Sequence, residues 1–136
     1  MHSFAGSDST ASTMQSFFWL VMSHPRVHAA LTSEIEEAVR AGTVPATGNV
    51  QWTESQGLVY FQACLKEALR IHNPVPMGLP RVAPKGGLTI GDKTLPEGTT
   101  VSVSPWVIHH SKEIWGPDAV RLIFNMHLTF DCEENP

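Results

Sequence analysis

The sequence predicts a mainly α-helical fold with a small β-hairpin or sheet portion. Three segments carry apolar residues at helical spacing, and each ends at a proline or a glycine. Residues 74–104 then begin with several prolines and go on to alternate apolar and polar residues, as strands do. With 136 residues, 42% hydrophobic and 16% charged, the chain has the composition of one globular unit at most.

Two helices are predicted in the first 41 residues. The first covers residues 4–22, where aromatic and aliphatic residues recur at helical spacing, and it ends before Pro25. The second starts at Pro25, because proline suits the first helical turn, and it ends near Arg40 with Gly42 as a stop. Its apolar stripe consists of Val27, Ala30, Leu31, Ile35, Ala38 and Val39.

A third helix is predicted over residues 57–71, after a loop at residues 42–53 that is rich in turn formers. Asn73-Pro74 stops this helix. Its apolar side is expected to hold Leu58, Phe61, Leu65, Ala68 and Leu69.

The β portion is predicted after residue 87. Residues 88–90 and 94–95 flank Gly91-Asp92 and form a plausible hairpin. Val101 and Val103 are expected on one face of a further strand, and residues 106–110 form a short helix. Residues 120–136 contain mixed apolar residues and an acidic end, and they remain unassigned.

Composition and motifs exclude several function classes. The net charge of −4 and the lack of a basic stripe argue against a nucleic-acid partner. No apolar run reaches the length of a membrane span, and two cysteines without CxxC spacing or a secretory leader favour an intracellular protein. Nucleophile-elbow, dinucleotide and P-loop motifs are absent from the sequence, and the pair His24 and His28 lacks the glutamate of a zinc site, so no metal ligands are assigned.

Two short stretches call for a chemical explanation. The first helix places Gly6, Asp8 and several hydroxyls on one turn, although glycine costs a helix about 1 kcal/mol relative to alanine. The third helix places Glu67 and Arg70 three residues apart, on one face, where they can pair. The pair alone is a weak signal, because surface helices contain many such pairs, and the turn could be a solvent-facing cap.

Five motifs in a fixed order give a more specific indication. They are AGSDST at 5–10, KEALR at 66–70, LPRVAP at 79–84, LPEGTTVSVSPWVIHH at 95–110 and WGPDA at 115–119. Together they resemble the C-terminal half of a cytochrome P450 of the eukaryotic microsomal type. The resemblance implies that residues 1–119 are part of the α-rich cytochrome P450 domain and that residues 120–136 are a divergent tail.

The resemblance also implies roles for single residues. Ala5 and Gly6 would lie on the face of the haem, Asp8, Ser9 and Thr10 would take part in oxygen activation and proton relay, and Arg81 would pair with a haem propionate. Ser9 stands where the family usually has threonine. Glu67 and Arg70 match the structural ExxR pair, which in the family is locked by an arginine from a later PERF-like motif.

Two family features are missing. The slot of the PERF-like motif reads Phe124-Asn125-Met126-His127, without the arginine, and the FxxGxxxCxG loop that provides the axial thiolate does not occur. Cys132 lacks the glycines of that loop, and Cys64 is most simply a core residue. The chain is therefore expected to be a truncated and inactive fragment.

The function implied by resemblance is haem-dependent monooxygenation of a small apolar organic substrate, with electrons from an NADPH-dependent reductase. Family members are usually anchored in the endoplasmic-reticulum membrane, and no anchor occurs in this sequence. Ala5 and the Val75–Leu79 stretch are the candidates for apolar contacts with a substrate. Two alternatives stay open: a non-catalytic helical interaction module, and an unrelated small α+β protein that shares the motifs by chance.

Overall fold

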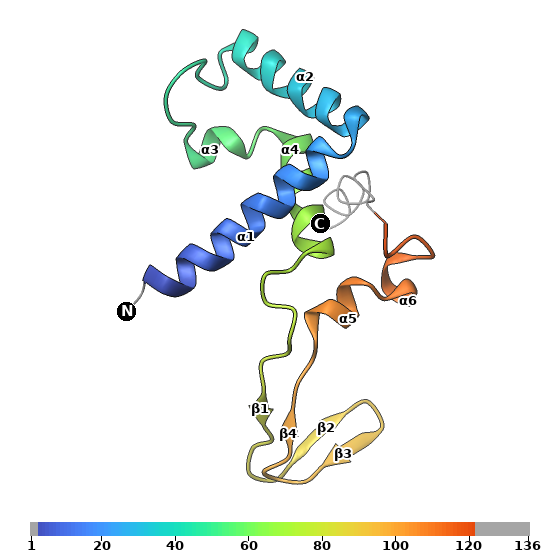
Figure 1. The fold of residues 1–136 in the computed structure, drawn as a ribbon. Coiled ribbons are helices and arrows are strands. Elements are labelled where there is room, and N and C mark those ends of the chain that lie inside the picture. Colours follow the sequence, from blue (N-terminus) through green and yellow to red (C-terminus); the bar gives the residue numbers. More distant parts are fainter. Residues whose placement is uncertain (1–2, 122–136) are drawn as a thin grey trace, which may run out of the picture.

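The computed structural model describes residues 3–121 and shows six helices and four short strands in that range (Figure 1). The helices are α1 (Ser3–Met22), α2 (Pro25–Ala41), α3 (Trp52–Ser55), α4 (Val59–Ile71), α5 (Pro105–His109) and α6 (Lys112–Trp115). The strands are β1 (Arg81–Val82), β2 (Leu88–Ile90), β3 (Lys93–Leu95) and β4 (Thr100–Val101). The mainly α fold with a small β portion is therefore confirmed.

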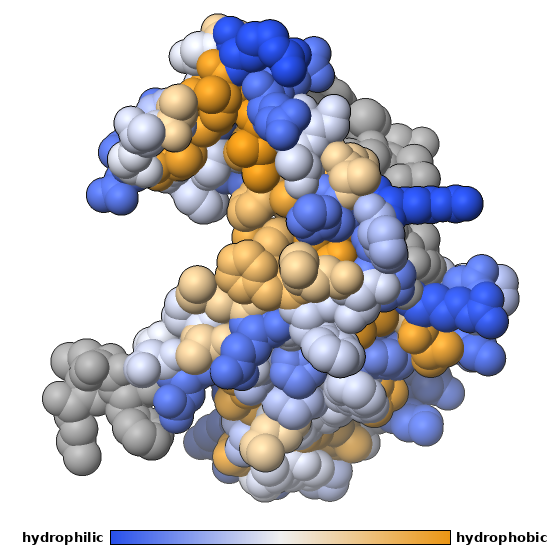
Figure 2. Space-filling model, turned by 45° about the horizontal axis from the view of Figure 1, so that its top comes forward, coloured by the Kyte–Doolittle hydropathy of each residue, from blue (hydrophilic) through white to orange (hydrophobic). Residues whose placement is uncertain are grey.

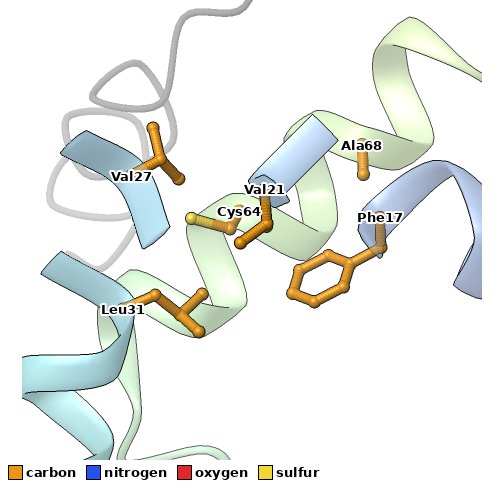
Figure 3. Packing of buried hydrophobic residues seen from close by; sticks show 6 residues of the cluster. All are labelled: Phe17, Val21, Val27, Leu31, Cys64 and Ala68. Atoms are coloured by element: carbon orange, nitrogen blue, oxygen red, sulfur yellow. The ribbon is translucent and has the colours of Figure 1, made fainter. Parts of the chain in front are cut away.

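The hydrophobic core lies where α1, α2 and α4 meet (Figure 3). Phe17 and Val21 enter from α1, Val27 and Leu31 from α2, and Cys64 and Ala68 from α4, as the side chains in Figure 3 show. The Phe17 ring also packs on Phe61 of α4, with 5.4 Å between the ring centroids. The core thus fixes α4, which carries the Glu67–Arg70 pair, against α1, which carries the polar turn.

The helix ends follow their local sequence signals. Gly42 ends α2 in the left-handed conformation, with φ at 74°, and its N–H donates to the carbonyl oxygens of Ala38 and Val39. The predicted loop over residues 42–53 is wrong at its end, because Trp52 begins α3. The Gln51 N–H donates to Glu54 Oε2 over 2.7 Å there, which caps the short helix.

Helix α4 begins two residues later than predicted, and its start is capped from another helix. Both carboxylate oxygens of Glu34 in α2 accept hydrogen bonds from α4, one from the Tyr60 N–H over 2.7 Å and one from the Phe61 N–H over 2.8 Å. A negative charge at this end of a helix also complements the helix dipole. Glu34 therefore connects α2 to α4 by satisfying donors that the helix itself leaves free.

The β portion consists of two antiparallel pairs that lie at the far end of the molecule from α2 (Figure 1). The hairpin predicted at residues 88–95 is confirmed, with Leu88 opposite Leu95. The pairing of β1 with β4 brings Arg81 opposite Val101 and was not predicted.

The extended segment before β1 is held close to the chain after β4. The Ser104 hydroxyl donates to the Pro76 carbonyl oxygen over 2.9 Å. A Cβ atom on Gly78 would lie 1.9 Å from Ser102 Oγ and 2.6 Å from the Val103 carbonyl oxygen, so only glycine fits this approach. In this way β1 and its Arg81 are tied to the segment that leads into α5.

Among the helices of residues 3–121, none is long and apolar enough to cross a membrane.

Candidate functional site

The Glu67–Arg70 pair lies in the interior of the molecule. One helical turn of α4 places both side chains on the buried face, where Glu67 is 0% exposed and Arg70 is 3% exposed. Arg70 Nε donates to Glu67 Oε2 and Arg70 Nη2 to Glu67 Oε1, each over 2.8 Å. This is a bidentate, charge-assisted contact, the geometry for which arginine is better suited than lysine.

Arg70 also binds three backbone carbonyl groups from the far end of the described chain. Nη1 donates to the His109 oxygen over 2.5 Å and to the Ala119 oxygen over 2.6 Å, and Nη2 donates to the Arg121 oxygen over 2.9 Å. With the two bonds to Glu67, all five N–H groups of the guanidinium have an acceptor. The arginine that is missing from the PERF-like position at residues 124–127 is thus not needed to satisfy the donors of Arg70.

An aromatic ring and a histidine complete the surroundings of Arg70. Trp115 of α6 lies with its ring centroid 5.3 Å from Arg70 Cζ, and its indole N–H donates to the Ile108 carbonyl oxygen over 2.9 Å. His109 has its Nδ1 atom buried without a hydrogen-bond partner among the described residues. Burial lowers the pKa of His109, and the neighbouring positive charge of Arg70 lowers it further.

The polar turn of the first helix lies at its N-terminal end. Gly6, Asp8 and Thr10 are exposed and Ser9 is half-buried, and a Cβ atom on Gly6 would meet nothing within 4 Å. Ala5 belongs to the same turn of α1 by its backbone. The N-terminal end of α1 therefore carries an exposed carboxylate and an exposed hydroxyl, with the Ser9 side chain half-buried between them.

Further hydroxyls of α1 hold this turn in place. The Thr13 hydroxyl donates to the Ser9 carbonyl oxygen over 2.9 Å, one helical turn away. Ser12 Oγ lies 3.3 Å from His72 Nε2, at the end of α4. No sequence motif marks Ser12 or Thr13, and the only sequence signal for His72 is its position two residues after Arg70.

Arg81 lies apart from these groups, on β1. Its side chain is exposed, and Nη1 donates to the carbonyl oxygen of the preceding Pro80 over 3.0 Å. Arg81 lines a cavity of about 550 Å³ with Leu79, Ile90 and Val103. The structure thus brings Glu67 and Arg70 together, keeps Ala5 to Thr10 on one helix end, and leaves Arg81 accessible on a separate element.

The described residues do not fit a thiolate-ligated haem by themselves. Cys64 is 1% exposed in the core, and burial, followed by the negative charge of Glu34, raises its pKa to about 11. A thiol of that kind stays protonated and inaccessible at neutral pH, whereas the axial ligand of this chemistry is a thiolate. The only other cysteine, Cys132, lies outside the described residues, as does the slot at residues 124–127.

No cluster of three or more histidine, cysteine or acidic side chains that could hold a metal ion occurs within residues 3–121.

The chain is similar to known proteins over most of its length. A family model described as cytochrome P450 matches residues 2–121. The chain is 43% identical over 115 residues to the cytochrome P450 monooxygenase hepC of Aspergillus oryzae, covering 85% of this chain and 22% of that protein. It is 39% identical over 131 residues to a pisatin demethylase of Fusarium vanettenii, covering 96% of this chain and 24% of that protein.

Solved structures of cytochromes P450 are also similar to this chain. A zebrafish cytochrome P450 determined with progesterone has a TM-score of 0.77 and 26% sequence identity, covering 91% of this chain and 28% of that one. A second cytochrome P450 crystal structure has a TM-score of 0.76 and 26% identity, with 98% and 30% covered. The chain thus spans about a quarter of the length of the proteins it matches. The chance agreement of motifs in an unrelated small protein is excluded, since sequence and fold agree over most of the chain.

Proposed function

The chain belongs to the cytochrome P450 family. We propose that it carries three parts of a haem-thiolate monooxygenase: the helix that faces the bound oxygen, the ExxR pair, and the arginine that pairs with a haem propionate. In that family activity one atom of dioxygen enters an organic substrate, and bound haem supplies the iron at which dioxygen is activated. The observation that supports the proposal most is the buried Glu67–Arg70 pair, which stands in the motif order of the family and has an acceptor for all five guanidinium donors.

The polar residues at the N-terminal end of α1 would transfer protons. The Asp8 carboxylate and the Thr10 hydroxyl are exposed and the Ser9 side chain between them is half-buried, so these groups would pass a proton from solvent toward a group bound at this end of α1. Serine at position 9 keeps the hydroxyl of the usual threonine but lacks the methyl group that restricts its rotamer. We therefore expect proton delivery through Ser9 to be less well oriented than through threonine.

Arg81 would bind a carboxylate of the cofactor. The residue is exposed, lines a cavity and has donors besides the Nη1 group that binds Pro80, and a planar fork suits bidentate binding of a propionate. A titration with haem, followed by absorbance, tests this role. Arg81→Gln should weaken haem binding by about tenfold, while Lys93→Gln, an exposed cation on the neighbouring hairpin, should not. Equal affinities of the two variants would reject the role of Arg81.

The 136-residue chain by itself is proposed not to catalyse monooxygenation. The buried, protonated thiol of Cys64 cannot serve as the axial ligand, and the sequence around Cys132 lacks the glycines of the family loop. Reduced, haem-loaded protein with carbon monoxide should give the spectrum of haem without a thiolate ligand. A thiolate-type Soret band that persists in Cys64→Ser and disappears in Cys132→Ser would overturn this part of the proposal and leave the family assignment intact.

A non-catalytic interaction module is the second candidate, and one observation favours it. Met14, Phe18, Trp19 and Met22 form an exposed apolar face on α1, with Trp19 73% exposed. Figure 2 shows hydrophobic side chains gathered across the middle of the visible surface. Apolar faces of this kind mark interaction surfaces. Retention of an NADPH-dependent reductase by immobilised chain, lost in Trp19→Glu, would favour this candidate, and no retention would count against it.

A further inference from the structure

We propose that residues 122–136 dock, within the same molecule, into the groove between the end of α1, the start of α2 and the end of α4. This groove is called the α1–α2–α4 groove below. The proposal concerns the chain's own C-terminal segment and does not depend on haem binding or on the proposed monooxygenase function.

The α1–α2–α4 groove combines apolar walls with a basic rim. It has a volume of about 880 Å³. Leu20, Val27, Ile71 and Val120 provide the aliphatic walls. The polar side chains along it are Ser23, His24, Arg26 and Arg121, so the rim carries two arginines. Asp118 lies 3.7 Å from the Arg121 guanidinium and offsets one of these charges, while Arg26 is exposed.

The sequence after Arg121 matches these two properties. Every second residue from 122 to 130 is a large apolar one: Leu122, Phe124, Met126, Leu128 and Phe130. The alternate positions hold Ile123 and the polar residues Asn125, His127 and Thr129, and the acidic residues Asp131, Glu133 and Glu134 follow. One side of the segment can thus bury apolar surface against aliphatic walls while its acidic end approaches the basic rim.

The starting point of the segment is fixed beside the groove. The Arg121 carbonyl oxygen accepts a hydrogen bond from buried Arg70 over 2.9 Å, and the Arg121 N–H donates to the Asp118 carbonyl oxygen over 2.7 Å. Val120 and Arg121 themselves line the groove. Fifteen residues reach about 50 Å when fully extended, so the segment is long enough to return to its walls.

Attachment in the same chain favours this occupant over a second molecule. A segment tethered at the edge of its binding site has an effective concentration in the millimolar range, because only a few residues separate it from the groove. A second copy or another protein would have to compete with that concentration.

A photo-crosslinking experiment on the full chain tests the proposal. p-Benzoylphenylalanine replaces Ser23, which lines the groove, or Glu36, which is exposed on α2 outside it. After irradiation at low protein concentration, mass spectrometry should find crosslinks from position 23 to residues 122–136 within a monomer. Position 36 should give few such crosslinks.

Variants of the segment separate docking from random contact. Phe124→Asp with Leu128→Asp should lower the crosslinked fraction by about tenfold, because two apolar side chains lose their burial. Asn125→Asp with Thr129→Asp adds the same charge on the alternate positions and should leave it nearly unchanged. Crosslinked dimers that persist after Phe18→Glu with Trp19→Glu would identify a second copy as the occupant of the groove and overturn the proposal. Equal crosslinking from positions 23 and 36, or equal loss in both double variants, would also overturn it.

Discussion

At the scale of single residues, Arg70 is the group on which the described structure depends most. It is buried beside Glu67, and its remaining donors bind carbonyl oxygens 39, 49 and 51 residues further along the chain. A buried ion pair becomes costly as soon as one acceptor or donor is lost. The side chain therefore links α4 to the segment at residues 109–121 through hydrogen bonds to three of its backbone carbonyl groups.

Replacing Arg70 with lysine tests this dependence. Lysine keeps the charge but has three donors on one nitrogen, so it cannot bind both Glu67 oxygens and three carbonyl oxygens together. We expect Arg70→Lys to lower the free energy of unfolding by about 3–5 kcal/mol, measured by urea denaturation. Arg40→Lys, at an exposed position of α2, should change it by less than about 0.5 kcal/mol. Similar losses in both variants would contradict the prediction.

His109 predicts a pH dependence of stability. Because burial lowers its pKa in the folded state, the unfolded chain binds a proton at His109 more readily than the native chain. The contribution of His109 is therefore present above the unfolded pKa of about 6.5 and is lost as the pH falls from there toward the lower pKa of the folded state. Arg70 and His110 are the charged or titratable neighbours that oppose protonation.

Unfolding free energies measured across this pH range test the effect. His109→Phe should reduce the loss of stability on acidification relative to the unsubstituted chain. His28→Phe, at an exposed position of α2, should leave the pH profile unchanged. A profile that responds to His28 and not to His109 would show that another group is responsible.

At the scale of the elements, the start of α4 is held by α2. Glu34 accepts two backbone hydrogen bonds from α4, although 26 and 27 residues separate the partners. The contact acts as an N-terminal cap that is supplied by a different helix, which couples the formation of α4 to the position of α2.

The cap predicts a moderate loss of stability in Glu34→Gln. Glutamine retains one acceptor oxygen and no charge, so one N–H of α4 and the favourable interaction with the helix dipole are lost. The free energy of unfolding should fall by about 0.5–2 kcal/mol in chemical denaturation. Glu37→Gln, on an exposed position of the same helix, provides the control. An equal effect of the two substitutions would mean that overall charge, and not the cap, is responsible.

At the scale of the whole molecule, the exposed apolar face of α1 determines the behaviour in solution. Phe18 and Trp19 are 57% and 73% exposed, on a helix whose other side packs into the core. Single exposed apolar residues are common, but a continuous face along two helical turns promotes association.

We therefore expect the isolated chain to self-associate. Size-exclusion chromatography with light scattering should give a mass above that of a monomer, and Phe18→Glu with Trp19→Glu should lower it. Ala29→Glu with Ala30→Glu adds the same charge to exposed positions of α2 and should have little effect. A monomer with a sharp, reversible unfolding transition would contradict this expectation.

The sequence predicted where the helices begin and end more accurately than it predicted which of their side chains are buried. Periodicity and the stops at Pro25, Gly42 and Asn73 located α1, α2 and α4 within two residues. Leu69, however, was expected on the apolar side of α4, and it is 36% exposed, while Glu67 and Arg70 are buried. Hydropathy places charged residues outside, and only a set of specific acceptors reverses that preference. The short helices α3 and α6 were missed, because four residues contain too little periodicity.

The sequence by itself determined that Glu67 and Arg70 share one face of a helix, because they are three residues apart, and that Gly6 to Thr10 lie together in another helix. The tertiary structure alone decided that the face with Glu67 and Arg70 is buried and that backbone carbonyl groups of residues 109, 119 and 121 bind Arg70. Every residue has a backbone carbonyl group, so the pattern of side chains does not show which carbonyl groups bind a buried guanidinium. That depends on how the helices and loops pack against one another.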